Sequence, residues 1–272
     1  MQIFSRSPVG IAKSLRRNGS LITALAKREI LGRYRGSVMG IVWSFFIPLL
    51  MLAVYTFVFG SVFKSRWEAA GETRAEFPLI LFAGLIVFNL FSECLNRAPT
   101  LITSNVNFVK KVIFPLEILP LVSLGSAAFH AAVSLIVWLL AHIVLIGMPP
   151  VSIILFPLVL LPMVLFVLGI TWWLASLGVF LRDVSQIVNV VVTAMMFLSP
   201  IFYPASACPA ELRRFLVLNP LATTVEQARA VMFFGEWPDW QVFAISLFAG
   251  AVTAWGGFAW FQITRKGFAD VV

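Results

Sequence analysis

The sequence predicts an all-α integral membrane protein with six transmembrane helices, and three observations support this fold class. Hydrophobic residues make up 60% of the 272 residues and charged residues only 12%, with a mean hydropathy of +0.96, whereas soluble domains carry about 25% charged residues. The apolar residues gather in runs with few or no charges that are long enough, at ~1.5 Å per residue, to cross a hydrocarbon core of ~30 Å. Basic residues lie at the ends of these runs.

The first span and the basic segment before it set the sidedness of the chain. From Ser37 the chain carries no charge until Lys64. Residues 20–35 place apolar residues on one half of a helix and most cations on the other, which predicts an amphipathic interface helix drawn to anionic lipid. A simple solvated flank is the alternative. The four cations of this expected interface helix are Lys27, Arg28, Arg33 and Arg35.

The six transmembrane helices are expected over 37–63, 78–95, 118–146, 151–181, 184–203 and 241–263. Pro48 lies inside the first span and predicts a kink. With this topology, residues 96–117 are cytoplasmic and residues 204–240 are external. Of the 20 Lys and Arg residues, 14 then fall on the cytoplasmic side and 6 outside. Because cations accumulate in cytoplasmic segments, we expect both termini to be cytoplasmic.

Several function classes find no support in the sequence. We find no phosphate-binding loop, nucleophile elbow or His-Glu-x-x-His motif, so no cofactor and no metal are expected in this chain. The net charge of +8 lies at the edges of the apolar runs and indicates topology, not nucleic acid. No secretory signal is expected in residues 1–36. Cys94 and Cys208 fall on opposite sides of the expected membrane and are interpreted as packing residues.

The two histidines, His130 and His142, both lie in the third expected span. An ionisable side chain inside a membrane is a functional candidate. Neutral histidines hydrogen-bonded between helices are the commoner case, and a proton relay is the alternative.

Aromatic residues are frequent in the first span and at the end of the fifth. One interpretation is packing and lipid contact. The other is that some of them line a passage for a sugar chain, because a sugar ring can rest on an aromatic face and no ring of charged residues suggests an ion pore. The channel-lining candidates are Trp43, Phe46, Tyr55, Phe59, Phe197 and Tyr203.

Five stretches together resemble the membrane subunits of ATP-driven polysaccharide exporters, the ABC-2 permease type. They are KREILGRYRGSVMGIVWSFFIPLLMLAVYTFVFG (27–60), NVNFVKKVIFPLEILPL (105–121), LGVFLRDVSQIV (177–188), FLSPIFYP (197–204) and LNPLATTVEQAR (218–229). They are spread over nearly the whole chain. This resemblance implies export of a lipid-linked polysaccharide such as O-antigen, capsule or teichoic acid across the bacterial inner membrane.

The resemblance also implies roles and partners. The interface helix packs on a separate ATPase subunit, which binds ATP and Mg²⁺. A homodimer with two ATPase copies forms the pore, walled largely by spans 1 and 5. Short external helices dip back toward the membrane, where Asn219 is expected to cap a helix that begins at Pro220. The segment that docks on the ATPase carries the coupling residues Asn105, Phe108, Lys110, Lys111, Phe114 and Pro115.

Two alternatives remain open. A drug or small-lipid exporter of the ABC-2 type shares this topology. A membrane-embedded transferase needs paired acids or histidines at the membrane face, and Arg182-Asp183 is a sparse set for this chemistry. In some family members an arginine follows the Phe-Pro pair, where this chain has Leu116 and Glu117.

Overall fold

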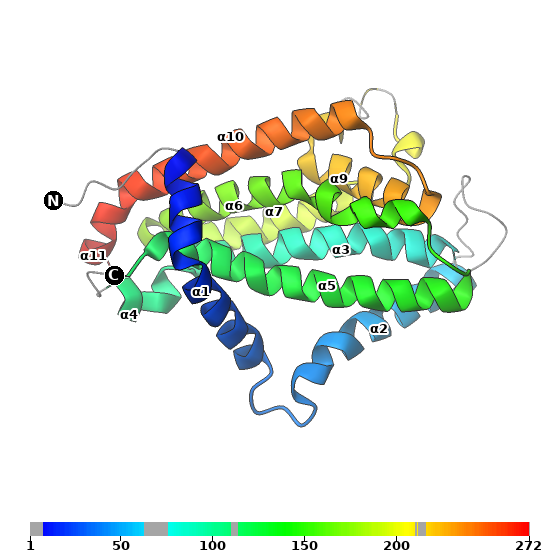
Figure 1. Ribbon diagram of the computed structural model, residues 1–272, viewed down its shortest axis with the longest axis horizontal. Coiled ribbons are helices and arrows are strands. Elements are labelled where there is room, and N and C mark those ends of the chain that lie inside the picture. Colours follow the sequence, from blue (N-terminus) through cyan, green and yellow to red (C-terminus); the bar gives the residue numbers. More distant parts are fainter. Residues whose placement is uncertain (1–7, 63–75, 110–113, 210, 212–215, 272) are drawn as a thin grey trace.

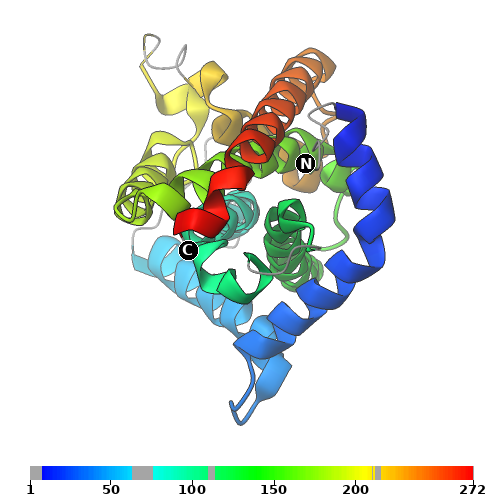
Figure 2. The same cartoon turned by 90° about the vertical axis from the view of Figure 1, so that its left-hand side faces the viewer.

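The structure, a computed structural model, describes residues 8–62, 76–109, 114–209, 211 and 216–271. All regular structure in these residues is helical, as the composition predicts. The long helices run side by side as a bundle, and α1 (Pro8–Arg33) crosses the bundle near the end that carries the short helices α4 (Val106–Val109) and α11 (Phe268–Val271) (Figures 1 and 2).

Seven further α-helices have defined bounds in the described residues. They are α2 (Trp43–Tyr55), α3 (Glu76–Arg97), α5 (Leu119–Leu145), α6 (Phe156–Phe180), α7 (Val184–Leu198), α9 (Pro220–Arg229) and α10 (Trp240–Thr264). Single turns of 3₁₀-helix adjoin several of them, and wider π-helical turns follow α2 over Thr56–Val62 and α9 over Ala230–Phe234.

Five helical stretches in the described residues are long and apolar enough to cross a membrane. They are Gly40–Phe59, Glu76–Thr100, Leu116–Leu145, Val151–Phe180 and Trp240–Gly267. The apolar helix α7 has only 15 residues. It therefore rises about 22 Å, less than the ~30 Å of a hydrocarbon core.

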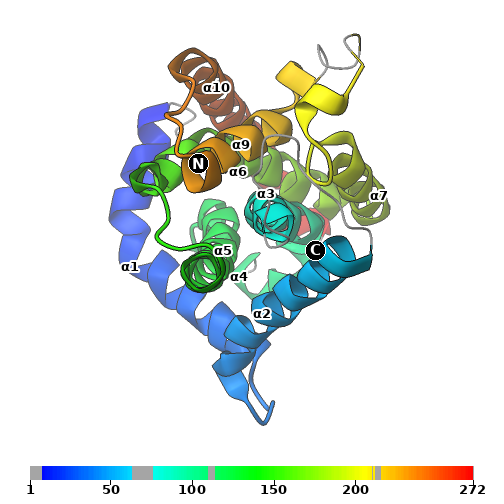
Figure 3. The same cartoon turned by 90° about the vertical axis from the view of Figure 1, so that its right-hand side faces the viewer.

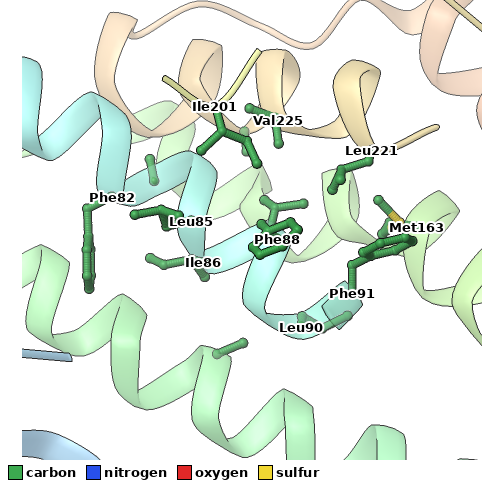
Figure 4. Packing of buried hydrophobic residues seen from close by; sticks show 14 of the residues in the cluster. Phe82, Leu85, Ile86, Phe88, Leu90, Phe91, Met163, Ile201, Leu221 and Val225 are labelled. Atoms are coloured by element: carbon green, nitrogen blue, oxygen red, sulfur yellow. The ribbon is translucent and has the colours of Figure 1, made fainter. Parts of the chain in front are cut away.

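Helix α3 is the centre of the bundle. Sixteen of its 22 residues are buried, and α2, α5, α6, α7 and α9 surround it (Figure 3). Phe88 and Phe91 of α3 lie in one apolar cluster with Met163 of α6 and Leu221 of α9 (Figure 4). The indole nitrogen of Trp138 in α5 donates a 2.8 Å hydrogen bond to the Leu79 carbonyl oxygen, so the buried N–H group also has a partner.

Helices α6 and α10 touch through their backbones. A Cβ atom built on Gly169 would lie 2.2 Å from the Thr253 carbonyl oxygen, and one on Gly257 would lie 2.1 Å from the Gly169 carbonyl oxygen. Such short distances leave no room for a side chain at these two positions unless the two helices move apart. Small residues allow close helix packing in membranes, where dispersion contacts take over from the hydrophobic effect.

Helix α2 is packed much more loosely than α3. Only Ser44 and Leu52 of its 13 residues are buried, and apolar side chains such as Leu50 and Val54 are exposed. Pro48 lies inside the helix and has no N–H group to donate to the Ser44 carbonyl oxygen. The exposed apolar surface of α2 identifies it as a helix that faces lipid or another protein.

Several helix ends differ from the sequence-based prediction. The expected interface helix at 20–35 is part of the longer α1, which continues through Gly32 and ends at Arg33. Gly36 then adopts a φ of 87°, a conformation favoured by glycine, where the chain turns toward α2. Helix α7 ends at Leu198, short of the expected residue 203, because Ser199 precedes a proline and is extended.

The predicted start of the helix after Asn219 is confirmed. The Asn219 Oδ1 atom accepts hydrogen bonds from the backbone N–H groups of Leu221 at 3.0 Å and Ala222 at 3.4 Å. Pro220 occupies the first helical position. The Asn219 amide also donates to the Ser199 hydroxyl at 3.0 Å, which ties the start of α9 to the end of α7.

Candidate functional site

The expected coupling segment begins with α4 and ends just before α5. The rings of Phe108 and Phe114 stack with centroids 4.2 Å apart and an angle of 7° between their planes. The guanidinium group of Arg28 in α1 lies 5.8 Å from the centre of the Phe108 ring, within cation–π range. The segment therefore presents an apolar pair bordered by a cation.

The other coupling candidates are placed as follows. The Asn105 side-chain amide donates to the Leu101 carbonyl oxygen at 2.9 Å, so it stabilises its own turn. Pro115 is half-buried next to Phe114. Lys110 and Lys111 lie outside the described residues.

Glu117 joins the coupling segment to the rest of the bundle. Its buried carboxylate accepts hydrogen bonds from Arg265 at 2.6 Å and from the Ser14 hydroxyl of α1 at 3.2 Å. Arg265 also donates to the Phe114 carbonyl oxygen at 2.7 Å, and the indole of Trp172 in α6 donates to the Glu117 carbonyl oxygen at 3.0 Å. Glu117, which departs from the pattern of some family members, thus has a partner within this chain.

The six aromatic candidates do not form one wall within the chain. Trp43 and Phe46 are 36% and 37% exposed near the start of α2. Tyr55, at the end of α2, lines a partly open cavity between α1, α2, α3 and α5.

The remaining aromatic candidates meet around Phe202. The Phe202 ring centre lies 6.4 Å from that of Phe59 and 6.0 Å from that of Phe197. Tyr203 donates from its hydroxyl to the Phe197 carbonyl oxygen at 2.9 Å. The π-helical turn that follows α2 and the end of α7 are therefore joined by an aromatic group. Phe197 itself is 60% exposed.

A charged cluster joins α1, α3 and α5. Glu93 lies 2.7 Å from Arg33, 2.9 Å from His130 and 3.8 Å from Arg97. Arg97 also lies 2.5 Å from Glu29 of α1. Of the four cations of the expected interface helix, Arg33 alone belongs to this cluster among the described contacts. Lys27, Arg28 and Arg35 are exposed.

The two histidines have separate surroundings. The His130 ring lies between Glu93 and the Tyr34 hydroxyl, which is 3.2 Å from Nε2. His142 lies at the other end of α5, where Nδ1 is 2.9 Å from the Gly147 carbonyl oxygen. Because a carbonyl oxygen only accepts, Nδ1 of His142 donates this bond. His130 thus connects helices, whereas His142 stabilises the end of its own helix.

Arg229 is a buried structural residue whose contacts the sequence did not reveal, because it was counted only as one of the external cations. Its side chain is 1% exposed and donates to the carbonyl oxygens of Ile80 at 3.2 Å, Pro200 at 2.5 Å and Ile201 at 2.5 Å. A Cβ atom on Gly84 would lie 3.1 Å from Arg229 Nη2, so glycine makes room for this group. Burial lowers the pKa of Arg229 to about 10, which leaves it protonated at pH 7.

In the part of the chain that the structure describes, no three His, Cys, Asp or Glu side chains come together to bind a metal ion. Cys94 is buried in α3 and packs against its neighbours.

Long apolar helices around a buried central helix define a multi-pass helical membrane protein. Residues 20–233 match the ABC-2 type transporter family, and the chain belongs to this family. The chain is similar to the O-antigen export system permease protein RfbA of Myxococcus xanthus, with 27% identity over 97% of this chain and 100% of the relative.

Two further relatives have related names. The O-antigen export system permease protein RfbA of Klebsiella pneumoniae is 24% identical over 93% of this chain and 95% of the relative. The polysialic acid transport protein KpsM of Escherichia coli is 25% identical over 79% of this chain and 81% of the relative.

Proposed function

We propose that this chain is the permease subunit of an ATP-driven exporter that moves a lipid-linked, O-antigen-like polysaccharide across the bacterial inner membrane. The observation that carries this proposal is the similarity to O-antigen export permeases over nearly the full length of both chains. The chain is a transporter subunit and not itself an enzyme.

In the proposed topology α7 is the fifth of six transmembrane helices, and both termini are cytoplasmic. The clustering of α4 and α11 at one end of the bundle supports this arrangement (Figure 1), as does the distribution of cations along the chain. Residues 96–117 form the cytoplasmic coupling loop and residues 204–240 the external segment, in which α9 is a re-entrant helix. The whole chain is one transmembrane permease domain.

The partners in this proposal are a second copy of the chain and two copies of a cytoplasmic ATPase, which bind ATP and Mg²⁺. Membrane lipid surrounds the assembly, and no nucleic acid takes part. The stacked Phe108–Phe114 pair and the adjacent basic residues dock on the ATPase. Apolar ring pairs of this kind suit a groove on a partner protein, because aromatic residues supply much of the binding free energy of interfaces.

The glycan path is proposed to lie between the two copies, lined by aromatic residues of α2 and α7. Trp43 and Phe46 of α2 and Phe197 of α7 are exposed on this chain, which supports such a role. The exposed apolar surface of α2 supports its contact with a second copy.

The transport step is tested in vesicles that contain the chain together with its ATPase. Labelled lipid-linked glycan is expected to cross only when ATP is hydrolysed, and the purified chain alone is expected to hydrolyse no ATP above a mock preparation. Transport of a drug or of small lipids in place of the glycan would favour the other kind of ABC-2 exporter. Glycosyl or acyl transfer without ATP would overturn the permease assignment.

The docking site is tested separately with Phe108→Asp. This variant is expected to remain folded in the membrane but to lose co-purification with the ATPase and export, because a charge replaces the ring that stacks on Phe114. Asn107→Asp is the matched control, since it adds the same charge at an exposed neighbouring position. If Phe108→Asp still binds the ATPase and exports glycan, the ATPase docks elsewhere.

A further inference from the structure

A cavity of about 780 Å³ lies between the end of α1, α2, α3 and α5. Sites for small molecules typically enclose about 300–1,000 Å³, so this cavity is large enough for a ligand. It shares no residue with the Phe108–Phe114 pair or with the Arg229 group.

The cavity has one charged end and one apolar end. Arg33, Glu93 and Arg97 line the charged end, at the level where the amphipathic helix α1 finishes, and Met51 and Phe82 line the apolar end. Glu93 and Phe82 are 11 residues apart on α3, or about 16 Å along the helix. This arrangement suits an amphiphile whose head lies at the membrane interface and whose chain points into the membrane.

The charged end offers hydrogen-bonding groups that the described part of the chain leaves unused. Arg33 and Arg97 contact the carboxylates only through Nη1, although a guanidinium group has five N–H donors. The Ser126 hydroxyl is buried at the cavity wall, and no described residue bonds to it. The Glu29 carboxylate is paired with Arg97 alone among the described contacts.

The charges around the cavity balance, which decides between ligand chemistries. Glu29 and Glu93 stand beside Arg33 and Arg97, and His130 contacts Glu93. Because the two carboxylates and the two guanidinium groups cancel, an anion alone gains little net attraction there. A zwitterionic head matches both signs, because a phosphate accepts from guanidinium N–H groups and an ammonium donates to carboxylates.

We propose that this cavity binds one phospholipid whose head carries a phosphate and a primary ammonium, as in phosphatidylethanolamine. The phosphate contacts Arg33 and Arg97, the ammonium contacts Glu29 and Glu93, and an acyl chain follows α2 and α3 toward Met51 and Phe82. The bound lipid fills the space between the loosely packed α2 and the rest of the bundle. This site does not depend on which substrate the protein exports.

The test uses the purified full-length chain, reconstituted in vesicles of phosphatidylethanolamine, phosphatidylglycerol or phosphatidylcholine with identical acyl chains. Lipids that stay bound after mild detergent extraction are counted by native mass spectrometry. We expect one phosphatidylethanolamine per chain, and at least about tenfold less retention of phosphatidylglycerol, which lacks the ammonium group. Phosphatidylcholine is expected to be equally weak, because its quaternary ammonium has no N–H group to donate.

Two pairs of variants locate the site. Ala131→Leu places a larger side chain at the cavity wall and is expected to abolish retention, whereas Ala132→Leu makes the same change at an exposed neighbouring position outside it. Arg33→Gln is expected to weaken retention about tenfold through the loss of a charged donor. Arg35→Gln removes an exposed cation that does not line the cavity and is expected to leave retention unchanged.

Three outcomes would overturn the proposal. Equal retention of phosphatidylglycerol would show that the ammonium group is not recognised. Wild-type retention by Ala131→Leu would place the lipid elsewhere on the protein. Displacement of phosphatidylethanolamine by a lipid-linked diphosphate at equal concentration would assign the cavity to the transport substrate.

Discussion

The guanidinium group of Arg229 connects three parts of the chain that are far apart in sequence. It bonds to carbonyl oxygens of α3 and of the residues that follow α7, while its own backbone ends α9. A buried charge is stable only when it is paired or hydrogen-bonded. The three carbonyl oxygens and Glu226, 3.2 Å away, fulfil this condition.

Arg229→Met is expected to lower the unfolding temperature of the detergent-solubilised protein strongly. The variant removes the donor from buried carbonyl groups, each of which costs about 1–3 kcal/mol when it loses its partner. Arg182→Met is the control, because Arg182 is exposed and its loss is expected to have little effect. Equal unfolding temperatures for the two variants would show that Arg229 does not hold α9 in place.

Arg265→Gln is expected to reduce the number of glycans exported per ATP hydrolysed by the complex, while the complex still assembles. The change breaks the ion pair with Glu117 and weakens the bond to Phe114, so movement of the coupling segment is transmitted less directly to α10. The control is Lys266→Gln, at the exposed neighbouring position. An unchanged ratio of export to hydrolysis would restrict Arg265 to a structural role.

Residue-scale features could be predicted from the sequence only where they are local. The cap of Asn219 on α9 was predictable, because donor and acceptor are two and three residues apart. The bond of Arg229 to Ile80 spans 149 residues, and that of Arg265 to Glu117 spans 148. No local pattern encodes such pairs, since they depend on how whole helices pack.

At the scale of helices, the contact between α6 and α10 depends on the absence of side chains. A Cβ atom on Gly257 would lie 2.1 Å from the Gly169 carbonyl oxygen, whereas one on the neighbouring Gly256 would lie 3.8 Å from the Trp173 ring. The two adjacent glycines therefore provide a matched pair of positions.

Gly257→Ala is expected to destabilise the protein and Gly256→Ala to be neutral or slightly stabilising. Alanine favours helix over glycine by up to about 1 kcal/mol, but overpacking at Gly257 costs about 1–3 kcal/mol. Unfolding temperatures of the two variants in the same detergent check this difference. If both are equally stable, α6 and α10 can separate at little cost.

Apolar runs and prolines predicted most of the long helices, because length and hydropathy are properties of a continuous segment. The ends were less predictable. Helix α1 continues through Gly32 because tertiary packing, including buried Ala26, stabilises it. Helix α7 ends at Leu198 because Ser199 precedes Pro200 and is extended. The sequence-based prediction was wrong here, because it ran the span through this pair to residue 203.

At the scale of the whole molecule, replacing exposed aromatic residues tests whether they line a transport path or face lipid. Alanine at Trp43, Phe46 and Phe197 together is expected to halt glycan export while ATP hydrolysis by the complex continues. Stacking of a ring on an aromatic residue contributes about 1–3 kcal/mol in nucleic acids, so each single alanine is expected to slow export only modestly.

The matched control replaces three exposed aromatic residues of α10, namely Phe248, Trp255 and Trp260. These changes are expected to lower the yield of inserted protein but not the export rate per assembled complex. Export is measured per complex for both variants. A wild-type rate in the α2 and α7 variant would show that other residues line the path.

The class of the molecule followed from its composition, since a chain with 60% hydrophobic residues has to be solvated by lipid. The direction in which each aromatic side chain faces could not be predicted from the sequence. Membrane helices are apolar all round and show no clear inward face. Tyr55 and Phe59 are one turn apart, yet one faces a cavity and the other joins the Phe202 group.

The burial of α3 has a consequence for how the protein is made. Of the five helices that surround α3, only α2 precedes it in the chain. During synthesis α3 therefore enters the bilayer before most of its neighbours exist, and lipid tails must cover its apolar surface until α5, α6, α7 and α9 arrive. Arg229 stands at the end of α9, the last of these neighbours. Ribosome-bound chains that stop before this residue are expected to hold α3 in a lipid-exposed, exchangeable state, and the arrival of α9 with Arg229 is expected to complete the burial of α3.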